Sequence, residues 1–242
     1  MFDSIRPNKA SLQIISQIRK QIFEGNLKPG DTLPPENKLM KQFNVSKQTL
    51  REALRALEFI GLIEINKGIT GGAKIVEMDN QIAIGLMVNF LYFKKLSIHH
   101  LTDMRRVIES YAAGVAAESM DDTDKDKLKE LIDSSKEDHD SNGLSPEIYY
   151  SDLNFHCKIA KSTKNPLLIL IVDLIESVMV DEKRGIIPDK EMNASIVNGH
   201  ERIYQAIVER NSEKARLEMS VHITEVEAYI LKFRKNNTWV RK

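Results

Sequence analysis

Residues 45–54 read Val45-Ser46-Lys47-Gln48-Thr49-Leu50-Arg51-Glu52-Ala53-Leu54, and this stretch decides the fold of the N-terminal third of the chain. Ser46 is a favourable N-cap residue, and Val45 and Leu50 have the spacing of a hydrophobic staple around a helix start. Apolar residues then recur at three- and four-residue intervals, which predicts one buried face. The exposed first turns keep three polar residues, Lys47, Gln48 and Arg51.

The segments around this helix predict a winged helix-turn-helix. A helical pattern over Glu36–Phe43 precedes it, separated by a tight turn through Asn44. Another helix is expected over Ser11–Phe23, and two alternating segments, Leu62–Asn66 and Ala73–Glu77, are joined by a glycine-rich turn. In this fold the second helix of the helix-turn-helix presents its N-terminal side chains to base edges and phosphates. An ordinary solvated helix is the alternative for residues 45–57 taken alone, but the turn and the wing at these distances favour DNA binding.

The same segment resembles the winged-helix domain of GntR-type bacterial transcription regulators over residues 8–77. The resemblance rests on Gly30-Asp31-Thr32-Leu33-Pro34-Pro35-Glu36, Val45-Ser46-Lys47, Leu50-Arg51-Glu52-Ala53-Leu54 and Gly61-Leu62-Ile63. It implies DNA contacts from the recognition helix and from a wing position, at Ser46, Lys47, Gln48, Arg51, Lys67 and Gly68. The chain departs from the family where Asn37 and Lys47 stand in place of a frequent arginine, which removes a planar bidentate donor at each position.

Charge is distributed unevenly although the 242-residue chain is formally neutral. Residues 1–78 carry 12 Lys and Arg against 8 Asp and Glu, and the remainder carries the opposite excess. A basic N-terminal part suits attraction to phosphate. The single cysteine, Cys157, excludes an internal disulfide framework, and the apolar run 167–172 is too short to cross a bilayer. With no apolar targeting segment at the N-terminus, we expect a soluble protein of the reducing cytoplasm without membrane contact.

Helical periodicity alone continues beyond residue 79. The expected helices span Gln81–Phe93, Ser97–Glu118, Asp124–His139, Glu147–Ser162, Pro166–Glu182, Glu191–Arg210 and Ser212–Phe233. They predict an all-α bundle of six or seven helices over residues 80–236 and a mainly α fold class for the whole chain.

Four polar residues of this bundle occupy positions on apolar helix faces: Asp152, His156, His200 and His222. Such groups are costly to bury unless they are paired or bound to a cation. One carboxylate and three imidazoles suit a divalent ion such as Zn, Ni, Mn or Fe. Hydrogen-bonded core histidines, and a plain helix pair for Asp152 with His156, are the alternatives. His99, His100 and His139 are expected at the surface, and Cys157 is expected in an apolar interior.

A second resemblance concerns the ligand-binding helical domain, called FCD, of the fatty-acid-regulator (FadR) branch of the GntR family. It rests on Asp152-Leu153-Asn154-Phe155-His156, Lys164-Asn165-Pro166-Leu167, Gly199-His200-Glu201 and residues 215–222. It implies a metal at the four polar positions and a small effector. It also favours Arg105, on the stripe of Leu101 and Ile108, as an effector-binding residue over a simple helix pair with Glu109.

These observations predict a DNA-binding transcription regulator, a repressor, whose operator affinity responds to a small carboxylate effector at the metal site. A homodimer on a palindromic operator is expected, because one winged helix reads only a few base pairs. The alternative is a metal-dependent hydrolase or lyase with an accessory DNA-binding domain. Against an enzyme, the sequence contains no His-Glu-x-x-His, P-loop or nucleophile-elbow motif.

Overall fold

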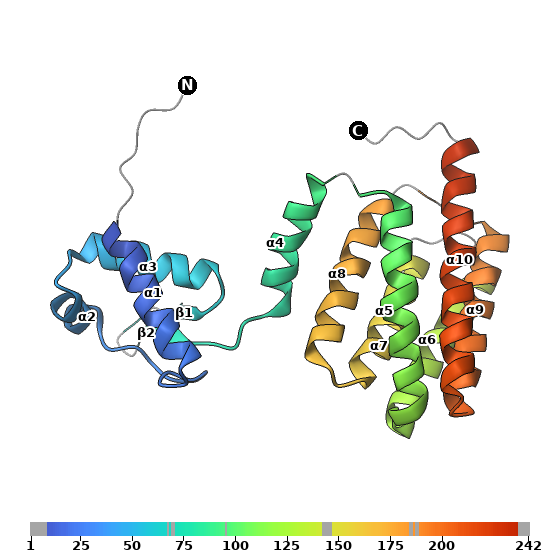
Figure 1. The fold of residues 1–242 in the computed structure, drawn as a ribbon, viewed down its shortest axis with the longest axis horizontal. Coiled ribbons are helices and arrows are strands. Elements are labelled where there is room, and N and C mark those ends of the chain that lie inside the picture. Colours follow the sequence, from blue (N-terminus) through green and yellow to red (C-terminus); the bar gives the residue numbers. More distant parts are fainter. Residues whose placement is uncertain are drawn as a thin grey trace. The chain divides into compact units, whose positions relative to one another are not determined.

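The computed structural model describes residues 9–66, 68, 71–94, 96–141, 147–183, 186 and 189–236; the side chains of residues 9, 137–141, 147–151, 181 and 236 are outside the description. The predicted wing residue Lys67 and the side chain of His139 therefore lie outside the described part. Contacts along the chain define two units, Met1–Gly85 and Leu86–Lys242, that divide within one helix, α4. Each unit is considered separately (Figure 1).

The N-terminal unit contains three helices followed by a strand pair. Its elements are α1 (Lys9–Phe23), α2 (Glu36–Phe43), α3 (Lys47–Phe59), β1 (Ile63–Asn66) and β2 (Gly72–Ile75). The strands are antiparallel, with Ile63 opposite Ile75 and Asn66 opposite Gly72. The pair begins and ends within two residues of the predicted segments, and Thr32 forms an isolated bridge with Lys74 beside it.

Local signals explain the ends of α2 and α3. Asn44 adopts a left-handed conformation at the C-cap of α2, with φ of 50°, and so makes the tight turn between the helices. Ser46 then caps α3 by accepting a hydrogen bond from Thr49 N at 3.2 Å. The chain leaves α3 through Gly61, with φ of 75°, where Leu62 N donates to Leu57 O at 3.0 Å. This closure makes β1 start after Leu62, one residue later than predicted.

The staple predicted from Val45 and Leu50 is part of the core of this unit. Leu50 is fully buried, and Val45 packs against the same cluster. The other buried members are Ile14, Ile18, Leu33, Leu39, Ala53, Leu54, Leu57, Leu62, Ile63, Ala73 and Ile75. The apolar faces of α1, α2, α3 and the strand pair thus share one core, as the winged-helix prediction requires.

Helices alone make up the described part of the C-terminal unit. They are α5 (Ile98–Ser119), α6 (Asp122–Ser141), α7 (Glu147–Ser162), α8 (Pro166–Lys183), α9 (Lys190–Val208) and α10 (Ser212–Asn236), with α4 (Asn80–Tyr92) ahead of them. The predicted mainly α class, a winged helix-turn-helix followed by an all-α bundle, is confirmed. No helix in the described part of the chain combines the length and the apolar character needed to span a membrane.

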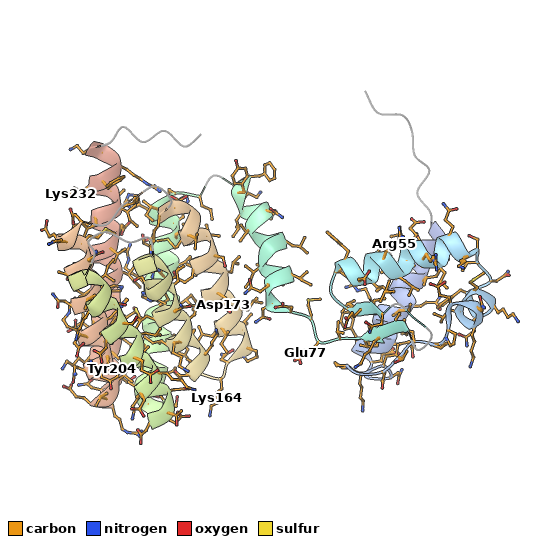
Figure 2. All side chains as sticks on the ribbon, turned by 180° about the vertical axis from the view of Figure 1, so that it is seen from behind. Arg55, Glu77, Lys164, Asp173, Tyr204 and Lys232 are labelled. Atoms are coloured by element: carbon orange, nitrogen blue, oxygen red, sulfur yellow. The ribbon has the colours of Figure 1, made fainter. Side chains whose placement is uncertain are left out.

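Helix α5 is the central element of this bundle. It packs against α7, α8, α9 and α10, and α10 lies alongside it over much of its length (Figure 1). Lys164, labelled in Figure 2, turns the chain between α7 and α8 in a left-handed conformation with φ of 55°. Asn165 then caps α8, because its Oδ1 accepts from Leu167 N at 3.1 Å and from Leu168 N at 3.2 Å. These turns set the faces that α7 and α8 present to α5.

Candidate functional site

The structure brings the four predicted metal ligands together inside the helical bundle. Asp152 and His156 lie one turn apart on α7, His200 lies on α9 and His222 lies on α10. All four are buried, with at most 2% of each residue exposed. One candidate ligand atom from each residue lies within 4.8 Å of those of the other three.

The spacing of these atoms fits a shared cation. Asp152 Oδ1 lies 3.1 Å from His200 Nε2, 3.6 Å from His156 Nε2 and 3.8 Å from His222 Nε2. An ion about 2.1 Å from each of two ligand atoms separates them by about 3.0–3.4 Å at bond angles near 90–110° and by about 3.6–3.8 Å at angles near 120–130°. Asp152 Oδ1 and His200 Nε2 are buried and form no hydrogen bond of acceptable geometry. Buried acceptors in this condition are what a divalent ion satisfies.

Burial and neighbouring charges set the protonation of the cluster. Burial lowers the pKa of His200 to about 4, and burial with the neighbouring His200 lowers the pKa of His222 well below its usual range. Burial would raise the pKa of Asp152, but Lys183 holds it well below its usual range. Burial also disfavours the imidazolium of His156, but Glu109 and Asp152 together overcome burial and raise its pKa to about 9. Two of the three imidazoles are therefore already in the neutral form that binds metals.

Two buried carboxylates and an arginine form a layer behind His156. Glu109 Oε2 lies 2.7 Å from His156 Nδ1, on the side of the ring away from Asp152. Arg105 Nε donates to Glu109 at 2.7 Å, and Arg105 Nη2 lies 2.9 Å from Glu176 Oε1. A carboxylate on the second nitrogen of a ligand histidine fixes its tautomer and orientation. The layer therefore leaves Nε2 of His156 as the nitrogen available to an ion.

The sequence analysis missed Glu176 and Lys183 and treated Glu109 only as a helix partner of Arg105. A signal for both missed residues was present in α8. Glu176 and Lys183 continue the buried stripe of Val172 and Met179 at three- and four-residue spacing. An acid and a base on such a stripe indicate buried partners on neighbouring helices, but they do not say which helices.

The environment of Arg105 differs from the expected effector clamp. The interior position is confirmed, since only 1% of the residue is exposed. Its Nε and Nη2 face Glu109 and Glu176, however, so the guanidinium edge that would grip a carboxylate bidentately is already engaged. Nη1 is buried without a hydrogen-bond partner. Arg105 thus offers a ligand only the N–H groups of Nη1 rather than a two-nitrogen fork.

Two close contacts hold the histidine rings in place. The ring of Phe155 stacks on that of His200 with centroids 3.8 Å apart. Gly199 allows α9 and the ring of His222 to approach, because a Cβ at position 199 would lie 2.4 Å from His222 Nδ1. The glycine beside His200 therefore serves the ligand on the next helix.

His99, His100 and Cys157 lie outside the four-residue cluster and have other surroundings. His100 completes a capping box with Ser97 at the start of α5, and His99 Nδ1 lies 2.6 Å from Glu227 Oε1 at the surface. Cys157 is partly buried, and burial raises the pKa of its thiol. None of these three side chains belongs to the four-residue cluster.

The candidate DNA-binding residues lie on an exposed face of the N-terminal unit. Lys47, Gln48 and Arg51 project from the first turns of α3 and line one surface depression. Arg51 Nε lies 3.2 Å from both carboxylate oxygens of Glu36 on α2. Arg55, labelled in Figure 2, lines the same depression one turn beyond Arg51 and was missed by the sequence analysis.

The wing adjoins the same helix. Gly68 has φ of 116°, a conformation that favours glycine. Gly68 and Arg51 line one groove together with residues of the segment that precedes α2. The fold thus places the described wing residue beside the recognition helix.

Comparison with known proteins assigns both units. Residues 10–70 match the model described as "Bacterial regulatory proteins, gntR family", and residues 100–225 match the FCD domain. The chain belongs to the GntR family. Like other GntR-family members with an FCD domain, it is a transcription regulator with a DNA-binding domain and an effector-binding domain, and the FCD match is compatible with the FadR branch.

Individual GntR-family relatives are similar in sequence to most of this chain. The HTH-type transcriptional regulator LutR of Bacillus subtilis is 30% identical over 211 residues, which cover 85% of this chain and 94% of LutR. The HTH-type transcriptional repressor NanR of Citrobacter rodentium is 29% identical over 226 residues, with 91% and 85% covered. Streptococcus agalactiae GntR has a similar fold, with a TM-score of 0.66 at 22% identity over 90% of this chain and 99% of that one.

Proposed function

We propose that this regulator is a homodimeric repressor whose affinity for a palindromic operator changes when a small organic acid binds beside a divalent metal ion. The proposal assigns operator binding to residues 8–77 and metal and effector binding to residues 80–236, and places the protein in the bacterial cytoplasm with its operator. The observation that carries it is the convergence of Asp152 Oδ1 with three histidine Nε2 atoms inside an effector-binding domain.

Asp152, His156, His200 and His222 are the residues that would hold the ion, with Zn, Ni, Mn and Fe as candidates. When bound, the ion would supply a Lewis-acidic position for a carboxylate oxygen of the effector. Four protein ligands leave positions for the effector in ions that take five or six ligands. His200 and His222 are kept neutral by burial, and the carboxylate of Glu109 lies at ion-pair distance from Nδ1 of His156.

The charge of the cluster supports an anionic effector. Two buried cations, Arg105 and Lys183, face three buried carboxylates, those of Glu109, Asp152 and Glu176. A divalent ion therefore leaves a net positive charge, and burial raises the pKa of Glu176, which adds to the positive balance. Arg105 would contribute its positive charge and the N–H groups of Nη1 rather than a clamp from two nitrogens. A small carboxylate would offset this excess at low desolvation cost.

For DNA binding, we assign Ser46, Lys47, Gln48 and Arg51 of the recognition segment and Lys67 and Gly68 of the wing, and we add Arg55. Side chains of the first turns of α3 are exposed and line one surface depression, which supports their contact with a groove of DNA.

A dimer would double these contacts on a symmetric operator. Exposed Met104, Val107 and Tyr111 recur along one side of α5 and provide apolar surface for pairing.

The test combines metal, acid and operator in one titration. Protein stripped with chelator is reloaded with Zn, Ni or Mn, small carboxylic acids are screened by thermal shift, and operator affinity is measured with and without each hit. We expect one or more acids to change operator affinity by about 5–150-fold, the usual size of such coupling. His156→Ala should bind the operator without acid as the parent does and lose the response.

Matched controls distinguish loss of the effector site from general damage to the fold, and a turnover assay distinguishes a regulator from an enzyme. His99→Ala removes a surface histidine 63% exposed at its side chain and should respond as the parent does. Arg105→Lys keeps a positive charge beside Glu109 and Glu176, and it should weaken, but not abolish, the change in operator affinity caused by the acid. Recovery of the acid unchanged, followed by NMR, is expected of a regulator, whereas turnover would favour the hydrolase or lyase. A parent-like response in His156→Ala would place the effector elsewhere.

A further inference from the structure

Lys183, the last residue of α8, lies against the metal-ligand cluster although it is a base. Its ammonium forms an ion pair with Asp152 Oδ2, the carboxylate oxygen that does not face the three histidine Nε2 atoms. The side chains of both residues are almost fully buried, with 2% and 1% exposed. A long cationic side chain is rarely buried to this extent unless it has a partner, and here the partner is a candidate ligand.

The two oxygens of Asp152 therefore have separate partners. Oδ1 faces His200 Nε2 at 3.1 Å, and Oδ2 is held by Lys183 from the other side. A carboxylate held in this way can offer one oxygen to an ion but cannot turn both toward it. The ammonium also offsets the negative charge of Asp152, so the ligand set neutralises less of the charge of a divalent ion.

We propose that Lys183 is a positioning residue that keeps Asp152 a one-oxygen ligand and so preserves an open, positively charged coordination position for an anionic effector. The inference rests on the proposed metal site. Glu109 occupies the corresponding place at His156, where its carboxylate lies at ion-pair distance, 2.7 Å, from Nδ1. Helices α5 and α8, which supply none of the four ligands, thus orient two of them from outside.

Cobalt(II) serves as the probe because its visible absorption weakens as its coordination number rises. The Kd for Co(II) and the absorption band are measured for the parent, Lys183→Met, Lys183→Gln and the control Lys190→Met, which removes an exposed lysine at the start of α9. We expect Lys183→Met to lower the Kd about tenfold or more, because the buried ammonium no longer opposes the charge of the ion. Its band should weaken, because Asp152 can then present both oxygens.

Lys183→Gln keeps an N–H donor without the charge, so its band should match the parent's while its Kd falls. Lys190→Met should match the parent in both measurements. An unchanged band in Lys183→Met would overturn the proposal, and so would a raised Kd, because Lys183 would then strengthen metal binding instead of leaving positive charge on the ion. Where circular dichroism shows Lys183→Met unfolded, Lys183→Gln decides: a lowered Kd with the parent's band supports the proposal and any other result overturns it. A parent that binds no Co(II) overturns the metal site itself, which distinguishes the two failures.

Discussion

His156 has different partners on its two ring nitrogens. Nδ1 faces Glu109 at 2.7 Å, whereas Nε2 faces His222 Nε2 at 3.3 Å and Asp152 Oδ1 at 3.6 Å. The carboxylate side keeps the ring protonated near neutral pH, and the other side is where an ion would bind. The same residue therefore connects the charge layer of Arg105 and Glu109 to the ligand cluster.

We predict that metal binding at pH 7 releases about one proton, from His156, because metals bind the unprotonated nitrogen. The pKa of His156 is raised to about 9 and that of His200 is lowered to about 4, so only His156 carries a proton to lose. Metal affinity should accordingly rise with pH up to about 9 and level off above it. Calorimetry in two buffers of different ionisation enthalpy measures the release; His99→Ala should leave it unchanged, and a value of zero would contradict the assignment.

Arg51→Ala should weaken operator binding and, where Arg51 neutralises a phosphate, lower the slope of log affinity against log salt by about one. Arg51 is exposed on the recognition helix and is oriented at Nε by Glu36. Filter binding or fluorescence anisotropy over a salt series measures both quantities. Arg19→Ala, which removes an exposed cation of α1, is the matched control. Parent-like affinity of Arg51→Ala at physiological salt would remove this residue from the interface.

At the scale of the helices, α9 and α10 lie close together where Gly199 faces His222. A side chain at position 199 has no space, since its Cβ would meet the ring at 2.4 Å. The neighbouring ligand His200 is stacked on Phe155 of α7. The relative placement of three helices thus depends on one small residue.

Gly199→Ala is expected to lower the free energy of unfolding by about 1–3 kcal/mol through overpacking and to weaken metal binding roughly tenfold by displacing His222. Gly85→Ala is the matched control, because Gly85 lies in α4 with nothing within 4 Å of its would-be Cβ. That substitution should stabilise the protein by up to about 1 kcal/mol, since alanine is the better helix former. Urea denaturation and metal titration measure the two effects. If Gly199→Ala and Gly85→Ala had the same free energy of unfolding and the same metal Kd, the close approach of α9 to His222 would not be needed for stability or metal binding.

Across the chain, the two units have separate hydrophobic cores. All four candidate metal ligands lie in the C-terminal unit. These ligands come from α7, α9 and α10, which are distant in sequence. An ion bound to the folded state alone therefore links segments that otherwise only pack together.

Chelation is expected to lower the thermal transition of the helical unit and to leave that of the winged helix unchanged. An ion present at one hundred times its Kd raises the free energy of unfolding of the unit that binds it by about 2.7 kcal/mol. Scanning calorimetry with chelator and then with added Zn or Ni measures the shift and its recovery. His222→Ala is the matched variant, and its transition should be indifferent to chelator. A parent protein equally indifferent, and free of metal by elemental analysis, would contradict the site.

Periodicity and capping signals along the chain were sufficient to predict most elements and the inward-facing ligands. Ser46 with the staple of Val45 and Leu50 predicted α3, and the stripe positions of His200 and His222 predicted their burial. These signals act within a few residues, because a helix repeats every 3.6 residues and exposes its buried face as a local pattern. Ends of elements, such as the late start of β1, depended on hydrogen bonds that this pattern does not specify.

Partners across helices could be decided only by tertiary packing. Arg105 was recognised as an inward residue, but its engagement with Glu176 depends on how α5 and α8 lie against each other. The pairing of Lys183 with Asp152 joins residues 31 positions apart in the same way. A local period states which face of a helix is buried and carries no information on which face of another helix meets it. The sequence therefore predicts the two domains and the ligand set, whereas the layer that orients those ligands and sets their charge arises from the packing of the bundle.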